Sequence, residues 1–203
     1  MSRLVKFIYV FIAVIFGVLI IIKTIEYFDP DFSKGFLSDK WVIFDRYKFF
    51  LYAHIIAAPI AFFAGGFQLI FPRTRLHRVL GWVYISSIVF LAAPGGFYMA
   101  FYAIGGTIST INFAVMAVLW FYFTLKAFLK VRAGDIHLHQ QFMARSFILT
   151  NSAILIRIFS FVNNHYQIMD VTTGYILIAW LSWLPWLLIY EWRKSNTRNS
   201  GDF

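Results

Sequence analysis

Histidine and arginine side chains carry most of the chemistry that this sequence offers. The stretch RTRLHRVLGWVY contains His77 and Arg78, and the stretch RAGDIHLHQQFMARSF contains His139 and Arg145. Two imidazoles at one depth can occupy both axial positions of a haem iron, while arginines hold the haem propionates. The alternative is that these side chains face lipid headgroups and the turns between helices.

A second set of polar residues lies deeper in apolar sequence. Arg157 interrupts the stretch NSAILIRIFSF, and His54 and Asn112 lie within two other apolar stretches. An unpaired arginine in hydrocarbon costs a few kcal/mol or more, so we expect Arg157 to point into the bundle near His54 and Asn112. These residues would then line a polar pocket open to the outside, suited to an anionic or lipidic substrate. The alternative is a structural network that orients helices.

Several kinds of chemistry are disfavoured by what the sequence lacks. The chain has no cysteine, which excludes disulfides, thiolate metal sites and iron–sulfur clusters. It also lacks the H-E-x-x-H pattern of zinc peptidases. No acidic residue lies in the interior of an apolar segment, since Glu191 stands at the very end of the last one, which argues against a proton pump or a cation transporter.

The elements that position these residues are hydrophobic enough to require a membrane. Of 203 residues, 61% are hydrophobic and 13% charged, against about 25% charged in soluble domains. A spanning helix needs about 20 mostly apolar residues. We therefore predict an all-α integral membrane protein, a single domain over residues 1–203 with a bundle of six transmembrane helices. The spans are expected near residues 5–25, 48–71, 78–103, 107–130, 142–163 and 171–192, with a polar cap at 26–47.

The charges divide unequally between the two sides of such a bundle. One side would carry twelve basic and three acidic residues, and the other five basic and six acidic. By the positive-inside rule both termini of this multi-pass membrane protein are expected in the cytoplasm. The net charge of +9 then reflects topology and contact with anionic lipid, so no nucleic-acid partner is expected.

This topology places the two sets of polar residues at different depths. His77 and His139 begin the third and fifth spans, so both are expected at the cytoplasmic edge, close to each other. Gly81 follows His77 by one helical turn, where it would admit a neighbouring helix or a flat ligand. Residues 132–147 are expected to form the cytoplasmic loop between the fourth and fifth spans. Pro94, followed by two glycines, predicts an irregularity in the third span.

The order of these motifs resembles an uncharacterised family of predicted bacterial membrane proteins, one of the domain-of-unknown-function families. The resemblance covers roughly residues 50–163: a histidine, then Leu-His-Arg-x-x-Gly, then Asp-Ile-x-x-His-x-x-x-Met-x-Arg. The matching positions are His54, His77, Arg78, Gly81, His139, Met143, Arg145 and Arg157. This resemblance implies a helical membrane bundle, located in the bacterial cytoplasmic (inner) membrane. The chain is also weakly similar to transmembrane b-type cytochromes, but its fourth span has no histidine, so one haem between His77 and His139 is what fits.

Three hypotheses for the function follow. The first is a membrane protein that binds haem b and exchanges electrons with quinone. The second is a non-enzymatic accessory subunit or assembly factor with a membrane-protein partner. The third is a carrier or enzyme for an anionic or lipidic substrate, acting through His54, Asn112 and Arg157.

Overall fold

The computed structural model describes residues 3–25, 27–29, 41–72 and 74–199, and all regular structure in these ranges is helical. The chain divides into two compact units, Met1–Met99 and Ala100–Phe203, and each is treated by itself below. Whether they form the single domain predicted over residues 1–203 stays a prediction.

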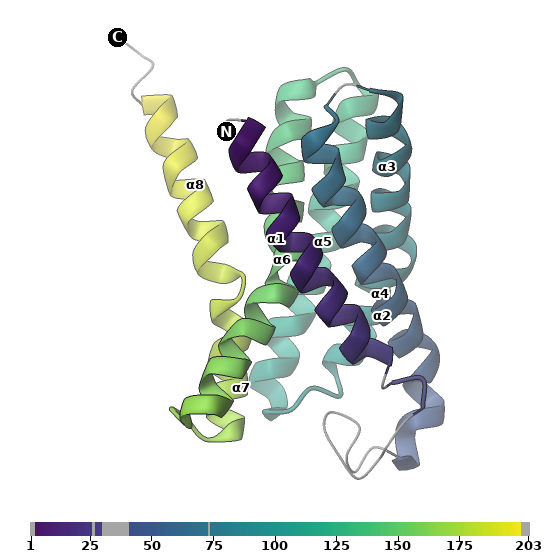
Figure 1. Cartoon of the computed structure of the whole chain (residues 1–203), viewed down its shortest axis with the longest axis vertical. Helices are drawn as coiled ribbons and strands as arrows, with labels where there is room; N and C mark the ends of the chain where they lie inside the picture. The colour runs from purple at the N-terminus through teal and green to yellow at the C-terminus, as the bar shows by residue number, and fades with distance from the viewer. Residues whose placement is uncertain (1–2, 26, 30–40, 73, 200–203) are drawn as a thin grey trace. The chain divides into compact units, whose positions relative to one another are not determined.

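Unit 1 is built around one long helix. Helix α2 (Trp41–Ile70) contacts α1 (Arg3–Ile25) and also a third helical segment (Figure 1). That segment consists of α3 (Arg75–Ser86), the π-helical turn η2 (Ser87–Ala92) and α4 (Ala93–Ala100).

The irregularity predicted around Pro94 is confirmed in this third segment. The N–H of Ala93 bonds to the carbonyl of Ile88, five residues earlier, which is the π-helical pattern. Proline has no N–H, so the helix must change its hydrogen bonding near Pro94. Such π-turns often lie at functional sites.

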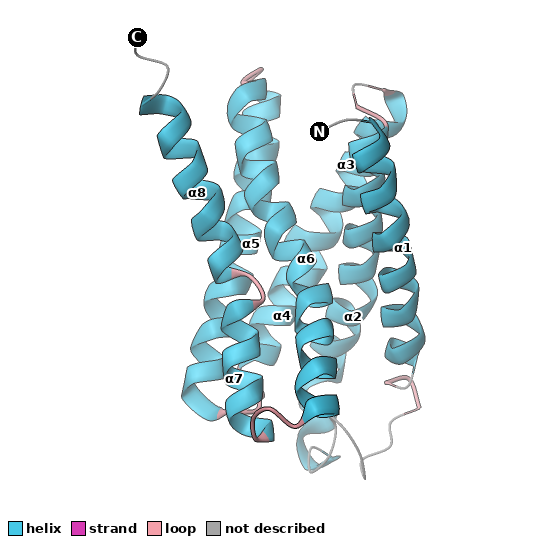
Figure 2. Ribbon diagram, turned by 60° about the vertical axis from the view of Figure 1, so that its left-hand side comes forward, coloured by secondary structure: helices cyan, strands magenta, loops and turns pink. Residues whose placement is uncertain are grey.

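Unit 2 consists of the antiparallel pair α5 (Gly106–Arg132) and α6 (Ile136–Tyr166), followed by α7 (Val171–Leu181) and α8 (Leu184–Asn199) (Figure 2). Buried polar side chains join the pair. The indole N–H of Trp120 donates to Thr150 Oγ1 at 3.0 Å, and the hydroxyls of Thr124 and Ser146 are 2.6 Å apart. Neutral hydrogen bonds of this kind hold helices together in hydrocarbon, where apolar surface alone gives little driving force.

Helices α7 and α8 are separated by a break at two residues. Pro185 has no N–H to continue the helical pattern, so the chain turns at Ser182 and Trp183 (Figure 2). The Ser182 hydroxyl donates to Ala179 O at 2.8 Å. The indole N–H of Trp183 donates to Asn112 Oδ1 on α5 at 2.9 Å, which anchors the break inside unit 2.

Five helical segments are long and apolar enough to cross a membrane, counting only the residues that the structure describes. Each has 26 to 31 residues: Phe44–Ile70, Arg75–Ala100, Gly106–Arg132, Ile136–Tyr166 and Val171–Asn196. Helix α1 covers the first predicted span with 23 residues, and its crossing of the membrane stays a prediction. Helix α2 begins at Trp41, so the end of the predicted polar cap is helical. Residues 26 and 30–40 of that cap lie outside the described residues.

The expectation of a loop over residues 132–147 is wrong for most of the segment. Only residues 133–135 are non-helical, and α6 begins at Ile136 instead of near residue 142. Gly134 takes the left-handed conformation with φ 78°, and Asp135 Oδ1 accepts the N–H of Leu138 at 2.9 Å. Together they turn the chain and cap the new helix at once, so α6 continues beyond its apolar part.

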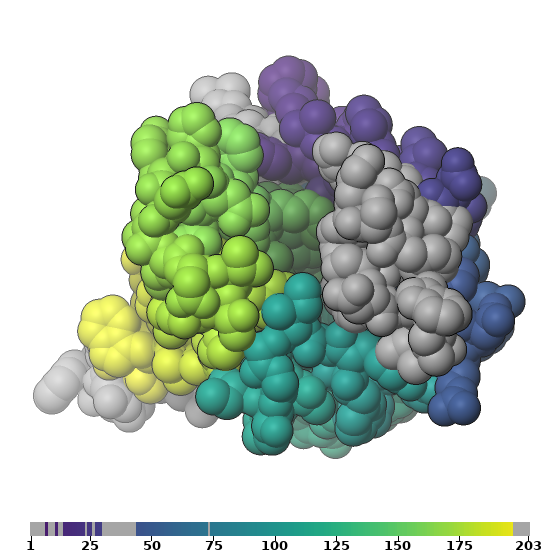
Figure 3. Space-filling view, turned by 90° about the horizontal axis from the view of Figure 1, so that it is seen from below, coloured from purple at the N-terminus to yellow at the C-terminus, as the bar shows by residue number. Residues whose placement is uncertain are grey.

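The opposite end of unit 2 is the corner between α6 and α7, which faces the viewer in Figure 3 (light green). Asn163 donates to and accepts from the backbone of Met169, and Asp170 caps α7 by accepting from Thr172 and Thr173. The N–H of Thr173 is the main cause that holds the pKa of Asp170 below its usual range. The cap is therefore intact above the ordinary carboxyl pKa of about 3.9 and is lost only as pH falls through the lower folded value.

Candidate functional site

Two helix corners of the same design carry the predicted inner-site histidines. In each corner, a side chain caps the N-terminus of the second helix. A histidine near the start of that helix then forms a hydrogen bond with a backbone carbonyl of the preceding helix. We call them the unit 1 corner, made of Gln68, Thr74 and His77, and the unit 2 corner, made of Ala127, Asp135 and His139.

In the unit 1 corner, Thr74 caps α3 and accepts the N–H of His77 at 3.1 Å. The His77 ring places Nδ1 3.3 Å from the carbonyl oxygen of Gln68 on α2. The Gln68 side chain forms a second hydrogen bond, donating from Nε2 to His77 O at 2.9 Å. Gln68 is 7% exposed, and its Oε1 is buried with no hydrogen-bond partner among the described residues.

In the unit 2 corner, Asp135 caps α6 and His139 follows one turn later. His139 Nδ1 lies 2.9 Å from the carbonyl oxygen of Ala127, a fully buried residue of α5. His137, two residues earlier, differs: its side chain is exposed, and its Nε2 lies 2.7 Å from the amide of Gln141 on the same helix. Of the two histidines, His139 therefore contacts the preceding helix, whereas His137 lies on the surface.

The carbonyl partners fix which ring nitrogen carries the proton in both corners. A backbone carbonyl can only accept, so Nδ1 of His77 and of His139 must be the donor. Nε2 is then the nitrogen with the lone pair. Metal-binding histidines have this arrangement, in which the second N–H is given to a carbonyl that orients the ring. The donor set of each corner therefore fits an axial haem ligand.

The space beside His77, at Gly81, is filled by the side-chain amide of Gln68, which the sequence did not indicate. A Cβ on Gly81 would lie 2.9 Å from Nε2 of Gln68. The glycine admits the amide of its neighbour on α2, so its space is not an open slot for a flat ligand. Gln68 could have been flagged in the sequence as a lone polar residue near the end of an apolar helix.

Arg145, predicted to hold a propionate, has a carboxylate partner within its own unit. Its Nε and Nη2 donate to the two carboxylate oxygens of Glu191 on α8, at 2.5 and 2.8 Å, and Arg145 is only 8% exposed. The guanidinium also lies 5.3 Å from the ring of Phe142 and 5.4 Å from that of Tyr190. Its charge is already neutralised, so a propionate would compete with Glu191. Arg78, whose side chain is exposed, is the better candidate.

Of the predicted outer set, His54 belongs to unit 1 and is tightly packed there. Its Nδ1 lies 2.7 Å from Ala92 O, the last residue of the π-helical turn. A Cβ on Gly95 would lie 2.6 Å from Phe50 O, and one on Gly96 would lie 3.0 Å from His54 Nδ1. The glycines after Pro94 therefore let α4 pass directly over the His54 ring.

The other two outer residues lie in unit 2, and the structure separates their roles. Asn112 is fully buried and accepts from Trp183, while its Nδ2 has no hydrogen-bond partner among the described residues. Arg157 is exposed and donates from Nη1 to Ala153 O on its own helix at 3.0 Å. The expectation that Arg157 points into the bundle is therefore not met within unit 2. A long side chain can instead lie along its helix and reach toward the headgroups. Its position relative to His54 stays a prediction.

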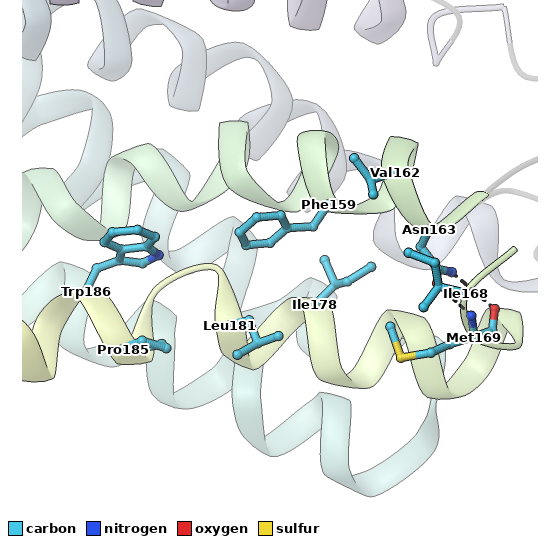
Figure 4. A pocket seen from close by; sticks show the side chains of 9 residues that line it. All are labelled: Phe159, Val162, Asn163, Ile168, Met169, Ile178, Leu181, Pro185 and Trp186. Atoms are coloured by element: carbon cyan, nitrogen blue, oxygen red, sulfur yellow. Dashed lines mark hydrogen bonds between the residues drawn. The ribbon is translucent and has the colours of Figure 1, made fainter. Parts of the chain in front are cut away.

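An apolar groove opens between α6, α7 and the start of α8, away from the histidine corner of unit 2 (Figure 4). It has a volume of about 350 Å³, and Asn163 is the one polar side chain among its lining residues. Both oxygen and nitrogen of that amide are bonded to Met169. The groove suits hydrocarbon, and none of the predicted site residues lines it: the lining is Phe159, Val162, Asn163, Ile168, Met169, Ile178, Leu181, Pro185 and Trp186.

Known proteins identify a family for this chain but no activity. No curated protein and no solved structure matches the chain. The family described as "Predicted membrane protein (DUF2306)" matches residues 51–192, a range that holds both histidine corners and all five candidate spans except the start of the first and the end of the last. The chain therefore belongs to this family of predicted membrane proteins.

Proposed function

We propose that this membrane protein binds one haem b, with His77 and His139 as axial ligands, and exchanges electrons with a membrane quinone. The observation that supports it is the shared design of the two corners. Each histidine gives Nδ1–H to a backbone carbonyl of the preceding helix and keeps the Nε2 lone pair for a metal. His77 belongs to unit 1 and His139 to unit 2, so their pairing on one iron is a prediction from the sequence.

The residues of the chain would have distinct tasks around such a haem. The carbonyls of Gln68 and Ala127 fix the ring orientations and make the ligand nitrogens more basic. Arg78 would pair with a propionate, with Arg145 secondary because Glu191 already binds it. When bound, the haem would supply one-electron chemistry that no side chain here provides. Helix α5 has no histidine, so a second bis-histidine haem is not proposed.

The proposal includes the predicted topology, with six spans and both termini in the cytoplasm of a bacterial cell. It places the two corners at the cytoplasmic edge, near anionic lipid. Reporter fusions at Gly134, in the turn between α5 and α6, should show a cytoplasmic location. Fusions at Ile168, between α6 and α7, should show an external one. If both report the same side, the orientation or the span count is wrong.

The direct test of haem binding is the absorbance of the purified full-length protein, produced in cells supplied with a haem precursor. We expect a Soret band that sharpens and shifts on reduction, with one haem per chain. A protein without a Soret band, even after addition of haem, would overturn the proposal. The hypothesis of an accessory subunit or assembly factor would then take its place.

A further inference from the structure

We propose that Gln68 is a positioning residue for His77, and that Gly81 provides the space in which the Gln68 amide lies. This inference rests on the proposed role of His77 as a haem ligand. It adds a specific device that sets how firmly that ligand is held, and therefore the potential of the haem.

The first support is that Gln68 holds His77 at two points. Its backbone carbonyl accepts from the ring at 3.3 Å, and its side chain donates to the His77 carbonyl at 2.9 Å. The shorter bond is the one made by the side chain. Because the side chain fixes the backbone of His77, it also keeps the ring nitrogen within reach of the Gln68 carbonyl.

The second support is the absence of a side chain at residue 81. Gly81 follows His77 by four residues, so it lies on the same face of α3, one turn further along. A Cβ there would lie 2.9 Å from Gln68 Nε2, closer than real Cβ contacts allow. Any larger residue at position 81 would therefore force the amide, which ends a flexible side chain, to shift from the position in which it bonds to His77 O.

The two bonds between Gln68 and His77, from the ring to Gln68 O and from Gln68 Nε2 to His77 O, are called the clasp below. The third support is that the unit 2 corner lacks this clasp. His139 bonds to the carbonyl of Ala127, whose methyl side chain can donate nothing, and the residue four positions after His139 is Met143. The clasp is thus a feature of one ligand and not of the corner design in general. Gln68 keeps it although its Oε1 is buried without a hydrogen-bond partner among the described residues, which is unfavourable for any buried polar atom. This cost indicates that the amide N–H is needed.

Two substitutions disturb the clasp from opposite sides, and a third is a matched control. Gln68→Met keeps a flexible chain of similar length but removes the donor to His77 O. Gly81→Ala leaves Gln68 and His77 unchanged and displaces the amide. Gly66→Ala introduces the same methyl group on α2 where no atom lies within 4 Å.

We expect Gln68→Met and Gly81→Ala to raise the midpoint potential of the haem and to weaken haem binding by about 10- to 100-fold, as loss of an outer-shell partner does. A weaker Nδ1–H bond makes the ligand less basic, which favours the reduced iron. Gly66→Ala should keep the wild-type potential. Unchanged potentials in Gln68→Met and Gly81→Ala, with haem still bound, would overturn the inference and leave the proposed function intact.

A second readout separates failure of the inference from failure of the proposed function. In the haem-free protein, ¹⁵N signals of the His77 ring should show the proton on Nδ1, and this preference should be lost in Gln68→Met and Gly81→Ala but kept in Gly66→Ala. A wild-type protein that binds no haem but shows this pattern would contradict the proposed function alone. A wild-type ring with its proton on Nε2 would overturn the clasp whether or not the variants fold.

Discussion

Alanine in place of either His77 or His139 is expected to remove the haem from the purified protein. Each substitution deletes one of the two axial ligands, and the remaining imidazole cannot hold the iron alone at comparable strength. The loss should exceed the roughly 10- to 100-fold that removal of an outer-shell partner costs in metal affinity. The measurement is the ratio of haem absorbance to protein, with circular dichroism to confirm that the helices are retained.

His137 and His165 are the matched controls for this experiment. His137 is exposed two residues before His139, and His165 is exposed at the far end of the same helix, stacked on Phe161. Alanine at either position should leave the haem content at the wild-type level. Haem that survives in both His77→Ala and His139→Ala, or that is lost equally in the controls, would contradict the assignment of the ligands.

Replacing Arg145 with alanine is expected to destabilise the protein by about 3 kcal/mol. Breaking a buried ion pair costs about 3–5 kcal/mol because it leaves the other charge unpaired, and Glu191, with 43% of its side chain exposed, places this pair at the lower end. The substitution also removes the guanidinium from between Phe142 and Tyr190. Unfolding in mixed micelles by increasing denaturing detergent would measure the difference.

A double variant shows whether the ion pair itself is responsible. Removing both charges by Arg145→Met and Glu191→Met leaves no unpaired group, so this protein should be clearly more stable than Arg145→Ala. Arg132→Ala, an exposed arginine near the end of α5, should change stability by no more than about 0.5 kcal/mol. A double variant as unstable as Arg145→Ala would show that the cost comes from lost packing.

The fold was predictable where length and apolar content decide it. The helices around His54, Asn112 and Arg157 follow from runs of about 20 apolar residues. In hydrocarbon no water is present, so a helix is needed to pair the backbone N–H and C=O groups of such a run. Helix ends were less predictable. Asp135 caps α6 immediately after Gly134, so a polar segment that read as a loop is helical. Apolar content cannot show this, because a cap acts through one side-chain hydrogen bond.

The candidate site was predictable as residue types and not as contacts. His77 and His139 stand out in the sequence because they follow turns and begin helices. The ring contacts themselves are not visible in the sequence, because Gln68 and Ala127 accept through backbone carbonyls, which every residue has. Only the side chain of Gln68, a lone polar residue in an apolar helix, could have been noticed. The partner of Arg145 was missed because Glu191 lies 46 residues away, at the end of the last predicted span, and nothing in the sequence links the two residues.

Electron paramagnetic resonance of the oxidised wild-type protein tests the central claim most directly, because the signal reports both the presence of haem iron and its axial ligands. With His77 and His139 on one iron, we predict a low-spin ferric signal typical of two imidazole ligands, at one iron per chain. A high-spin signal from iron with a single protein ligand, or no haem iron at all, would contradict the account.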